Sequence, residues 1–464
     1  MTSAKETPQQ SSFTLSGSAP FLKSAPPSSL PSLAKRERAE ASLGKTLCFG
    51  LPMRHFAFAA FAFWIFSAEF ALHSSRLLGF DFEALWVLGL VHSLTLGFIA
   101  MTILGVMIQM SSVLWEIPLQ APHRLISLCW WGFSSGLATF VYFLWSGRIF
   151  YWIPAALAAL SLMGYIAIFI RTMFAAKKID WTGKHLAISS AYLISLAILG
   201  VLLAYDRERG VIFPDPQGAL IAHIHLALIG WVSLSIIGVS YRLVSMFALS
   251  HLESKTPGRL ALFLLNVGLL GLVWDSLWNG HRFLPLWASL LSAAYFIYAL
   301  QMFRIFKERM RKLDPSLSFT ILALFGGALW SALGLGLSFG WIKDSVHARE
   351  AYIASALLGW VTPFILGEIH KIVPFLVWLH VYSPQNFKPP VRVPKISDLT
   401  SQKLAWGELI ASIFALIFVV VGFLVKSRGI LRLGAFSWFL VATLYAINTA
   451  ISLKHLLWKD PRWS

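Results

Sequence analysis

Apolar stretches of roughly 20 residues, separated by short polar segments, recur along the chain from residue 54 onward. A helix rises about 1.5 Å per residue, so about 20 apolar residues cross a hydrocarbon layer about 30 Å thick. Charged or proline-rich segments lie between the stretches, for example Asp206 to Gly210 and Pro384 to Pro394. The pattern predicts twelve membrane-spanning helices, at residues 54–75, 84–108, 124–146, 150–173, 185–205, 218–248, 258–279, 283–304, 317–340, 350–379, 404–425 and 430–453.

The two ends of the chain differ from this pattern. Residues 1–53 are rich in Ser, Pro, Ala and Lys and have no apolar core, which is typical of a disordered basic tail. The first long apolar stretch is a full span, so the tail does not contain a signal-peptide hydrophobic region. The sequence therefore predicts a tail at 1–53, a membrane domain at 54–453 and a short C-terminal tail at 454–464.

The composition excludes a soluble protein. Hydrophobic residues make up 57% of the chain and charged residues only 13%, whereas soluble domains carry about 25% charged residues. The net charge of +17 is distributed between the spans and not gathered in one stripe, so we expect a lipid bilayer as the partner and no nucleic acid.

The distribution of basic residues predicts the orientation of the spans. The face that carries the N-terminal tail holds 26 of the 38 Lys and Arg and the opposite face holds 10, while Arg242 and Lys371 lie inside spans. Basic loops remain on the cytoplasmic side. We therefore expect both termini in the cytoplasm and a multi-pass location in a bacterial-type inner membrane.

Three even-numbered spans share a glycine motif that repeats at intervals of 133 and 129 residues. Glycines eight residues apart lie near one face of a helix and allow another helix to approach closely. Because each interval contains four spans, the copies share one orientation. The fold class expected is an all-α membrane protein of three parallel four-helix repeats, at about 54–173, 185–304 and 317–453, around a pseudo-threefold axis. The matching segments are His92 to Gly105, His225 to Gly238 and Ala354 to Gly367.

This arrangement resembles the haem-copper oxidase subunit I superfamily, and within it the NnrS-like haem- and copper-containing membrane proteins. The resemblance covers about residues 54–453 and depends on architecture and helix-end motifs. It implies a membrane metalloprotein that binds haem b, copper or both near the outer face. The implied activity is an oxidoreductase in respiratory electron transfer, or in nitric oxide or oxygen handling, with a quinol or a soluble cytochrome as electron donor.

Intramembrane histidines are the candidate ligands, because polar groups at this depth are costly. His92 corresponds to a haem ligand of the resembled family, although a lone histidine can also bond a carbonyl across helices. His225, in register with His92, corresponds to a copper ligand. His223 lies about 200° away from His225 around the helix. Both can serve one site only if the helix start is irregular; otherwise they face different sites.

Other positions depart from the resembled family. The seventh span lacks an adjacent histidine pair, and Asp275 and His281 are the nearest replacements, although an interfacial His281 can simply be solvated. The tenth span has Tyr352 and Ala354 where two histidines are expected, which leaves His347, just before the span, as a candidate haem ligand. A complete oxygen-reducing centre is therefore not predicted.

Two further functions remain open at this point. Transporters are also built from internal repeats, although few charges lie at mid-membrane here. A cofactor-free scaffold that keeps the oxidase fold is the other alternative. The remaining histidines lie near span ends or in loops, and we expect interfacial or solvated positions for them: His55, His73, His123, His185, His251, His380 and His455.

Overall fold

The computed structural model describes residues 49–79, 84–114, 117, 119–176, 179–250, 256–382 and 393–457. They belong to a single unit, residues 46–464. Most of the two predicted tails, together with His251, lies outside the described residues. The first described helix begins at Gly50 and the last ends at Leu457, so both helices extend a few residues into the predicted tails.

The described residues contain twelve helices that are long and apolar enough to cross a membrane, which confirms the predicted number of spans. Nine spans are single helices: α2 (Gly50–Leu77), α5 (His123–Ser146), α6 (Trp152–Ala175), α7 (Trp181–Arg209), α10 (Thr256–Trp278), α11 (Leu284–Lys307), α12 (Pro315–Ser338), α15 (Gln402–Leu424) and α16 (Arg428–Leu457). A short 3-10 helix, η5 (Ile396–Leu399), precedes α15.

The other three spans are composite, because a π-helical segment joins two α-helices. They are the second span, α3 (Leu85–His92), η1 (Ser93–Ala100) and α4 (Met101–Leu114); the sixth, α8 (Pro216–His225), η2 (Leu226–Ser233) and α9 (Leu234–Ala248); and the tenth, α13 (Val346–Ala354), η3 (Ser355–Val361) and α14 (Thr362–Tyr382). The π segments begin 133 and then 129 residues apart. A π segment leaves one extra residue in the helix and is frequent at functional sites.

Polar side chains fix where several spans begin. The carboxylates of Asp180, Asp215 and Asp314 accept hydrogen bonds from the first free backbone N–H groups of α7, α8 and α12. Proline follows the aspartate at the start of α8 and of α12, where no N–H partner is needed. The loop ends of α5 and α7 are closed by Gly147 and Gly210, both with positive φ.

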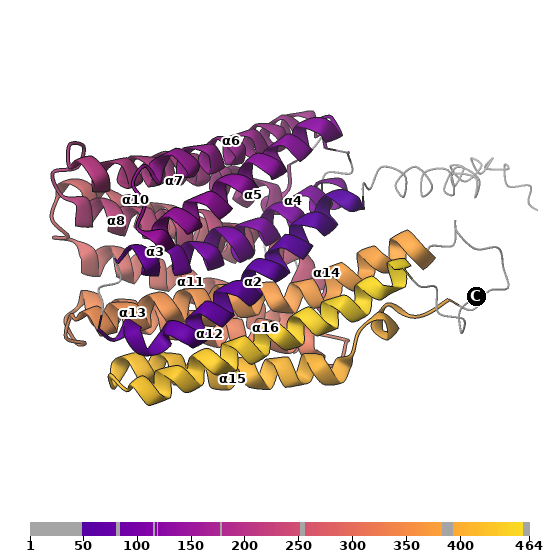
Figure 1. Cartoon of the computed structure of the whole chain (residues 1–464). Helices are drawn as coiled ribbons and strands as arrows, with labels where there is room; N and C mark the ends of the chain where they lie inside the picture. The colour runs from indigo at the N-terminus through magenta and orange to yellow at the C-terminus, as the bar shows by residue number, and fades with distance from the viewer. Residues whose placement is uncertain are drawn as a thin grey trace, which may run out of the picture. The chain divides into compact units, whose positions relative to one another are not determined.

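Consecutive spans contact each other along the whole chain, and α16 also packs against α2. The contacts therefore close into a ring of twelve spans. The Gly50 end of α2 and the Leu457 end of α16 lie at one end of the bundle, and α3, α8 and α13 lie at the other (Figure 1). The predicted orientation would make the end with α3, α8 and α13 the outer end.

The composite spans occupy the inside of the bundle. In their most apolar windows, 67–72% of the residues are buried within the protein, against 39–56% in the nine single-helix spans. Most of the large exposed apolar side chains, for example Phe174 and Phe303, lie on the single-helix spans, and only a few, such as Phe375, lie on the described composite spans. The single-helix spans therefore provide the lipid-facing surface, and the composite spans provide the interior.

The motif glycines lie where each composite span meets the span before it. At Gly359 the approach is closest, because Gly326 of α12 packs directly on its backbone. The second glycine of each motif faces a bulky side chain of the preceding span. A Cβ on Gly105 would lie 3.0 Å from His55 Cβ. A Cβ on Gly238 would lie 2.5 Å from His185 Cβ, and one on Gly367 would lie 2.9 Å from Phe319 Cβ. The expected packing role of these glycines is confirmed.

The expectation of an interfacial or solvated position is wrong for three histidines. His55 and His185 are 0% exposed and His455 is 5% exposed. His55 accepts a hydrogen bond at Nε2 from the Tyr165 hydroxyl, 2.7 Å away, and the Nδ1 atom of His455 lies 2.8 Å from the Tyr382 hydroxyl. The rings of His55 and His455 therefore each join two helices, which their positions near predicted span ends did not reveal.

Candidate functional site

A cavity of about 410 Å³ lies among the sixth to tenth spans. Leu, Ile, Ala and Trp side chains form most of its wall, and Ser292 of α11 with Ser331 and Ser338 of α12 add hydroxyl groups. Polar residues gather at the end of the bundle that carries α8 and α13. They are Gln217, His281, Asp344 and Arg349. Asp344 and Arg349 are exposed, so the cavity reaches the surface there.

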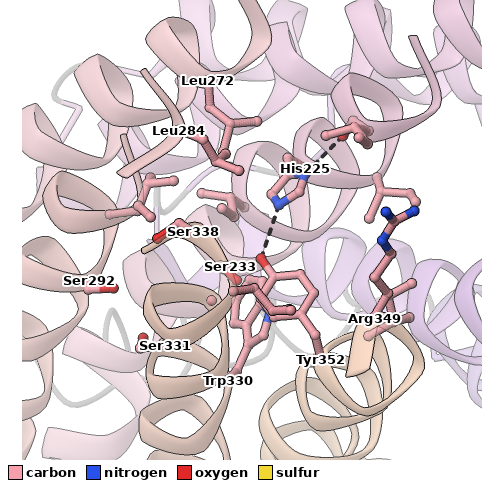
Figure 2. A pocket seen from close by; sticks show the side chains of 18 of the residues that line it. His225, Ser233, Leu272, Leu284, Ser292, Trp330, Ser331, Ser338, Arg349 and Tyr352 are labelled. Carbon is pink, nitrogen blue, oxygen red and sulfur yellow. Dashed lines mark hydrogen bonds between the residues drawn. The ribbon is translucent and has the colours of Figure 1, made fainter. Parts of the chain in front are cut away.

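His225 presents a ring nitrogen to this cavity. Its Nδ1–H donates to the Ile221 carbonyl one turn earlier, at 2.8 Å. In a neutral imidazole the other nitrogen, Nε2, then carries the lone pair. The Tyr352 hydroxyl donates to that Nε2 atom at 3.0 Å, and Figure 2 shows the two side chains pointing toward each other. The hydrogen bond joins the sixth span to the tenth.

The position of Tyr352 depends on two residues of α12. The Trp330 ring lies 5.8 Å from the tyrosine ring, and Figure 2 shows it beside the tyrosine. One turn after Trp330, Gly334 leaves room for the Tyr352 ring, since a Cβ there would lie 3.0 Å from Tyr352 Cε2. Tyr352 was recognised in the sequence only as the residue that replaces an expected histidine, and its contact with His225 was not predicted.

Aromatic side chains close the deep end of the cavity. Trp360 donates from Nε1 to the Ser233 hydroxyl at 2.9 Å, which is a second bond between the sixth and tenth spans. The Tyr295 ring packs edge-on against Trp360, with ring centroids 5.9 Å apart, and its hydroxyl donates to the Leu324 carbonyl. The polar atoms at this end are therefore satisfied within the protein.

His281 lines the polar end of the cavity and is partly exposed. It follows α10 with a positive φ of 65°, so the chain turns back over the helix end. Asp275 fixes this turn by accepting from Asn279 Nδ2 at 3.0 Å and from the Phe283 N–H at 2.9 Å. His281 lies within electrostatic range of His225, and its Nδ1 atom is buried without a hydrogen-bond partner.

An ion pair stands at the polar end of the cavity. Arg349 donates to both carboxylate oxygens of Asp344, from Nε at 2.7 Å and from Nη2 at 2.5 Å. This bidentate hydrogen bonding lowers the pKa of the Asp344 carboxyl below its ordinary value. Neither residue was a candidate in the sequence.

His92 and His223 do not line the cavity. The Nδ1–H of His92 donates to the Leu88 carbonyl at 2.7 Å, and the ring meets the edge of Phe140 on α5. His223 packs against Gly200 of α7, where a Cβ would lie 2.8 Å from its Cε1 atom. The two histidines lie within electrostatic range of each other. His223 and His225 thus face different sites, which was one of the two alternatives left open by their spacing.

His347 is placed apart from the other candidates. Its Nδ1 atom lies 2.9 Å from Oε2 of Glu350, a residue that is 8% exposed. It does not line the cavity, although Arg349 and Tyr352 of the same helix do. Across the described residues, no group of three or more His, Cys, Asp or Glu side chains is arranged to hold a metal ion.

No model of a known protein family matches this chain, and no curated protein matches it. The function must therefore be inferred from the residues themselves.

Proposed function

We propose that this membrane protein is a divergent haem-copper-oxidase-like protein that would hold haem b in the cavity through His225. It would act in respiratory electron transfer or in handling nitric oxide or oxygen, with a quinol or a soluble cytochrome as donor. The observation that carries the proposal is the oriented imidazole of His225 in the wall of an apolar cavity inside the membrane domain. Its Nε2 atom accepts from the Tyr352 hydroxyl, and a ligand bound to Nε2 would take the place of that hydrogen bond.

Two independent regularities support a pseudo-threefold arrangement of four-helix repeats. The π-helical segments follow the glycine motifs at the same intervals, 133 and 129 residues. The second glycine of every motif also packs against the span just before its own. Three copies of one four-span unit account for both regularities, and the resembled superfamily is built in this way.

The cavity residues fit a haem in their chemistry. Apolar walls exclude water from a macrocycle, and a neutral imidazole is a common axial ligand of haem iron. The bond from His225 to the Ile221 carbonyl orients the ring and raises the basicity of Nε2. Arg349, at the polar end, provides a guanidinium of the kind that binds a carboxylate such as a haem propionate. When bound, the haem would supply one-electron redox chemistry and a site for a diatomic gas.

The residues do not fit a copper ion bound by three imidazoles in the cavity, as the resemblance implied. His225 and His281 are the two histidines in the cavity wall. Among the described residues no third His, Cys, Asp or Glu joins them. We therefore restrict the proposal for this cavity to haem, with the unpartnered Nδ1 of His281 available to a bound ligand.

The test uses protein purified in detergent from haem-replete cells. Its visible spectrum is recorded in the oxidised state and again after reduction with dithionite, and a pyridine haemochrome assay identifies the haem type. We expect a b-type spectrum that is lost in His225→Ala. Tyr352→Phe should keep the haem, because iron bound at Nε2 would displace the tyrosine hydrogen bond from that atom. His55→Ala is the matched control, since it removes another buried histidine bonded to a tyrosine, outside the cavity.

Haem-free wild-type protein would overturn the proposal and leave the cavity to a transported apolar solute or to a scaffold without a ligand. A spectrum that survives in His225→Ala but is lost in His55→Ala would also overturn it.

A further inference from the structure

We propose that Arg76, Arg428 and Arg432 form a binding site for the phosphate group of an anionic phospholipid, in a pocket between the first and the twelfth spans. The inference goes beyond the proposed function, because this pocket shares no lining residue with the haem cavity. It concerns how the protein binds its membrane, and it does not depend on a haem.

The pocket has a volume of about 520 Å³ and lies where the end of α2 meets the start of α16. The two helices pack against each other. Their other ends, at Gly50 and Leu457, lie at the opposite end of the bundle, so the pocket is at the end that carries α3, α8 and α13 (Figure 1). Six residues line it: Ser75, Arg76, Gly79, Arg428, Gly429 and Arg432.

The wall of the pocket carries positive charge. Three of the six lining residues are arginines, and no Asp or Glu is among the described residues that line it. Elsewhere in the described part of the chain, no carboxylate lies within ion-pair distance of these three guanidinium groups. Like charges around one hollow repel each other and attract an anion. A guanidinium donates paired hydrogen bonds to phosphate oxygens, so phosphate is the group that this wall fits best.

The start of α16 adds backbone donors to the same pocket. The first N–H groups of an α-helix have no partner within the helix, and phosphate groups bind at such helix ends. Gly429 lies in the first turn of this 30-residue helix. A Cβ on Gly429 would meet no atom within 4 Å, so the backbone there is open to the pocket.

The arginines lie at a level where this chain has few basic residues. The predicted outer face holds 10 of the 38 Lys and Arg, and four of these ten gather here, because Lys426 lies in the turn just before α16. The basic residues that orient a membrane protein lie on the opposite, cytoplasmic side. Orientation therefore does not account for this cluster, whereas a bound anion does.

The surface next to the pocket indicates the source of the phosphate. Residues four positions apart lie on one face of a helix. Four positions beyond Arg432, toward the middle of the membrane, lies Phe436, which is 51% exposed. Four positions before Arg76 on α2, also toward the middle, lies Leu72, which is 73% exposed. Both helix faces therefore change from arginine at the span end to exposed apolar side chains, in the order of a phospholipid headgroup and its acyl chains.

Charge favours an anionic phospholipid over a zwitterionic one. Phosphatidylglycerol carries one negative charge, whereas the ammonium group of phosphatidylcholine cancels the charge of its phosphate. Three guanidinium groups would repel that ammonium group, and basic residues near a membrane surface attract anionic lipids.

The experiment is native mass spectrometry of the delipidated full-length protein in detergent, with dioleoyl-phosphatidylglycerol and dioleoyl-phosphatidylcholine added at equal concentrations. We expect about fivefold more phosphatidylglycerol than phosphatidylcholine on the wild type. The double variant Arg428→Gln/Arg432→Gln should lose this excess. Arg148→Gln/Arg282→Gln is the matched control, because it removes two exposed arginines from loops at the same end of the bundle, outside the pocket, and it should keep the excess.

A second measurement distinguishes a lipid from free phosphate. Phe436→Gln keeps all three arginines and removes an apolar side chain beside the pocket. It should weaken phosphatidylglycerol binding, and it should not change the thermal midpoint measured in inorganic phosphate relative to chloride at the same ionic strength. Phe303→Gln, at a side chain that is 65% exposed on α11, is the control and should bind phosphatidylglycerol like the wild type.

Several results would overturn the proposal. They are equal binding of the two lipids by the wild type, an excess of phosphatidylglycerol that survives in Arg428→Gln/Arg432→Gln, and an equal loss in Arg148→Gln/Arg282→Gln, which would mean that net charge alone attracts the lipid. Stabilisation by inorganic phosphate without retained phosphatidylglycerol would overturn the lipid as the source of the phosphate. None of these results depends on the haem spectrum, so this proposal and the proposed function fail separately.

Discussion

At the scale of single residues, the contact between Gly326 and Gly359 is the tightest approach between two spans in the described glycines. A Cβ on Gly326 would lie 2.0 Å from the Gly359 carbonyl oxygen and 2.1 Å from its carbon. Both atoms belong to the backbone, so no change of rotamer can relieve the overlap. The ninth and tenth spans, and with them Trp330 and Tyr352, would have to separate.

We therefore expect Gly326→Ala to destabilise the protein by about 1–3 kcal/mol or more, in the range of overpacked cores. Gly407→Ala is the control, because its Cβ meets only Leu444 Cδ1, at 3.8 Å, and alanine favours a helix. The thermal unfolding midpoints of the two detergent-purified variants, compared with wild type, measure the two changes in stability. Equal midpoints for the two variants would show that the close approach is not required.

The ion pair at the cavity entrance predicts a particular pH dependence. The pKa of Asp344 is lowered in the folded protein, so the pair contributes fully above the ordinary value of about 3.9 and is lost only as the pH falls through the lowered value. The difference in thermal midpoint between wild type and Asp344→Asn should be small, because the pair is exposed, and constant from pH 8 to pH 5. A difference that disappears between pH 7 and pH 6 would contradict the assignment.

Candidate residues could be predicted from the sequence where the helix register decides their position. His225 was identified through its distance from the motif glycines, and the structure places it in the cavity wall. The contact of His281 with the cavity was not predicted, because its position depends on a turn with positive φ that is fixed by Asp275. Arg349 was missed because it is an exposed residue that pairs with Asp344, five residues earlier and just before α13, and neither residue lies in an apolar pattern.

At the scale of elements, the three π-helical segments set how the two halves of each composite span are rotated. In the sixth span, η2 starts directly after His225 and ends five residues before Gly238. The histidine half therefore faces the cavity while the glycine half packs against His185 of α7. Length and apolarity predicted all twelve spans, but π-helical geometry could not be predicted, because the apolar pattern is continuous through the π segments.

Inserting one alanine after Leu228 adds a second extra residue to η2 and should rotate the two halves of the sixth span by about 100° relative to each other. Gly238 and His225 can then no longer both make their contacts, so we expect a large loss of folded, monodisperse protein in size-exclusion chromatography. Inserting one alanine after Val211, which is 71% exposed in the loop before α8, should be tolerated. An intact protein with the insertion after Leu228 would mean that the rotation between the two halves is not required.

At the scale of the whole molecule, the orientation in the membrane is still a prediction from the basic loops. We expect Lys312, between α11 and α12, in the cytoplasm, and Lys343, between α12 and α13, outside. After replacement of Cys48 and Cys129, a membrane-impermeant maleimide added to intact cells should label Lys343→Cys at once. Lys312→Cys should be labelled only after lysis. The reverse pattern would place the cavity entrance on the cytoplasmic side.

The packing of α16 against α2 has a consequence for the order of the chain. The first and last described helices are neighbours whose free ends lie at the same end of the bundle (Figure 1). A flexible linker from Leu457 to Gly50, with new termini opened between α11 and α12, would preserve every contact between spans. Such a circular permutant should fold, because a closed ring of helices has no obligatory first member.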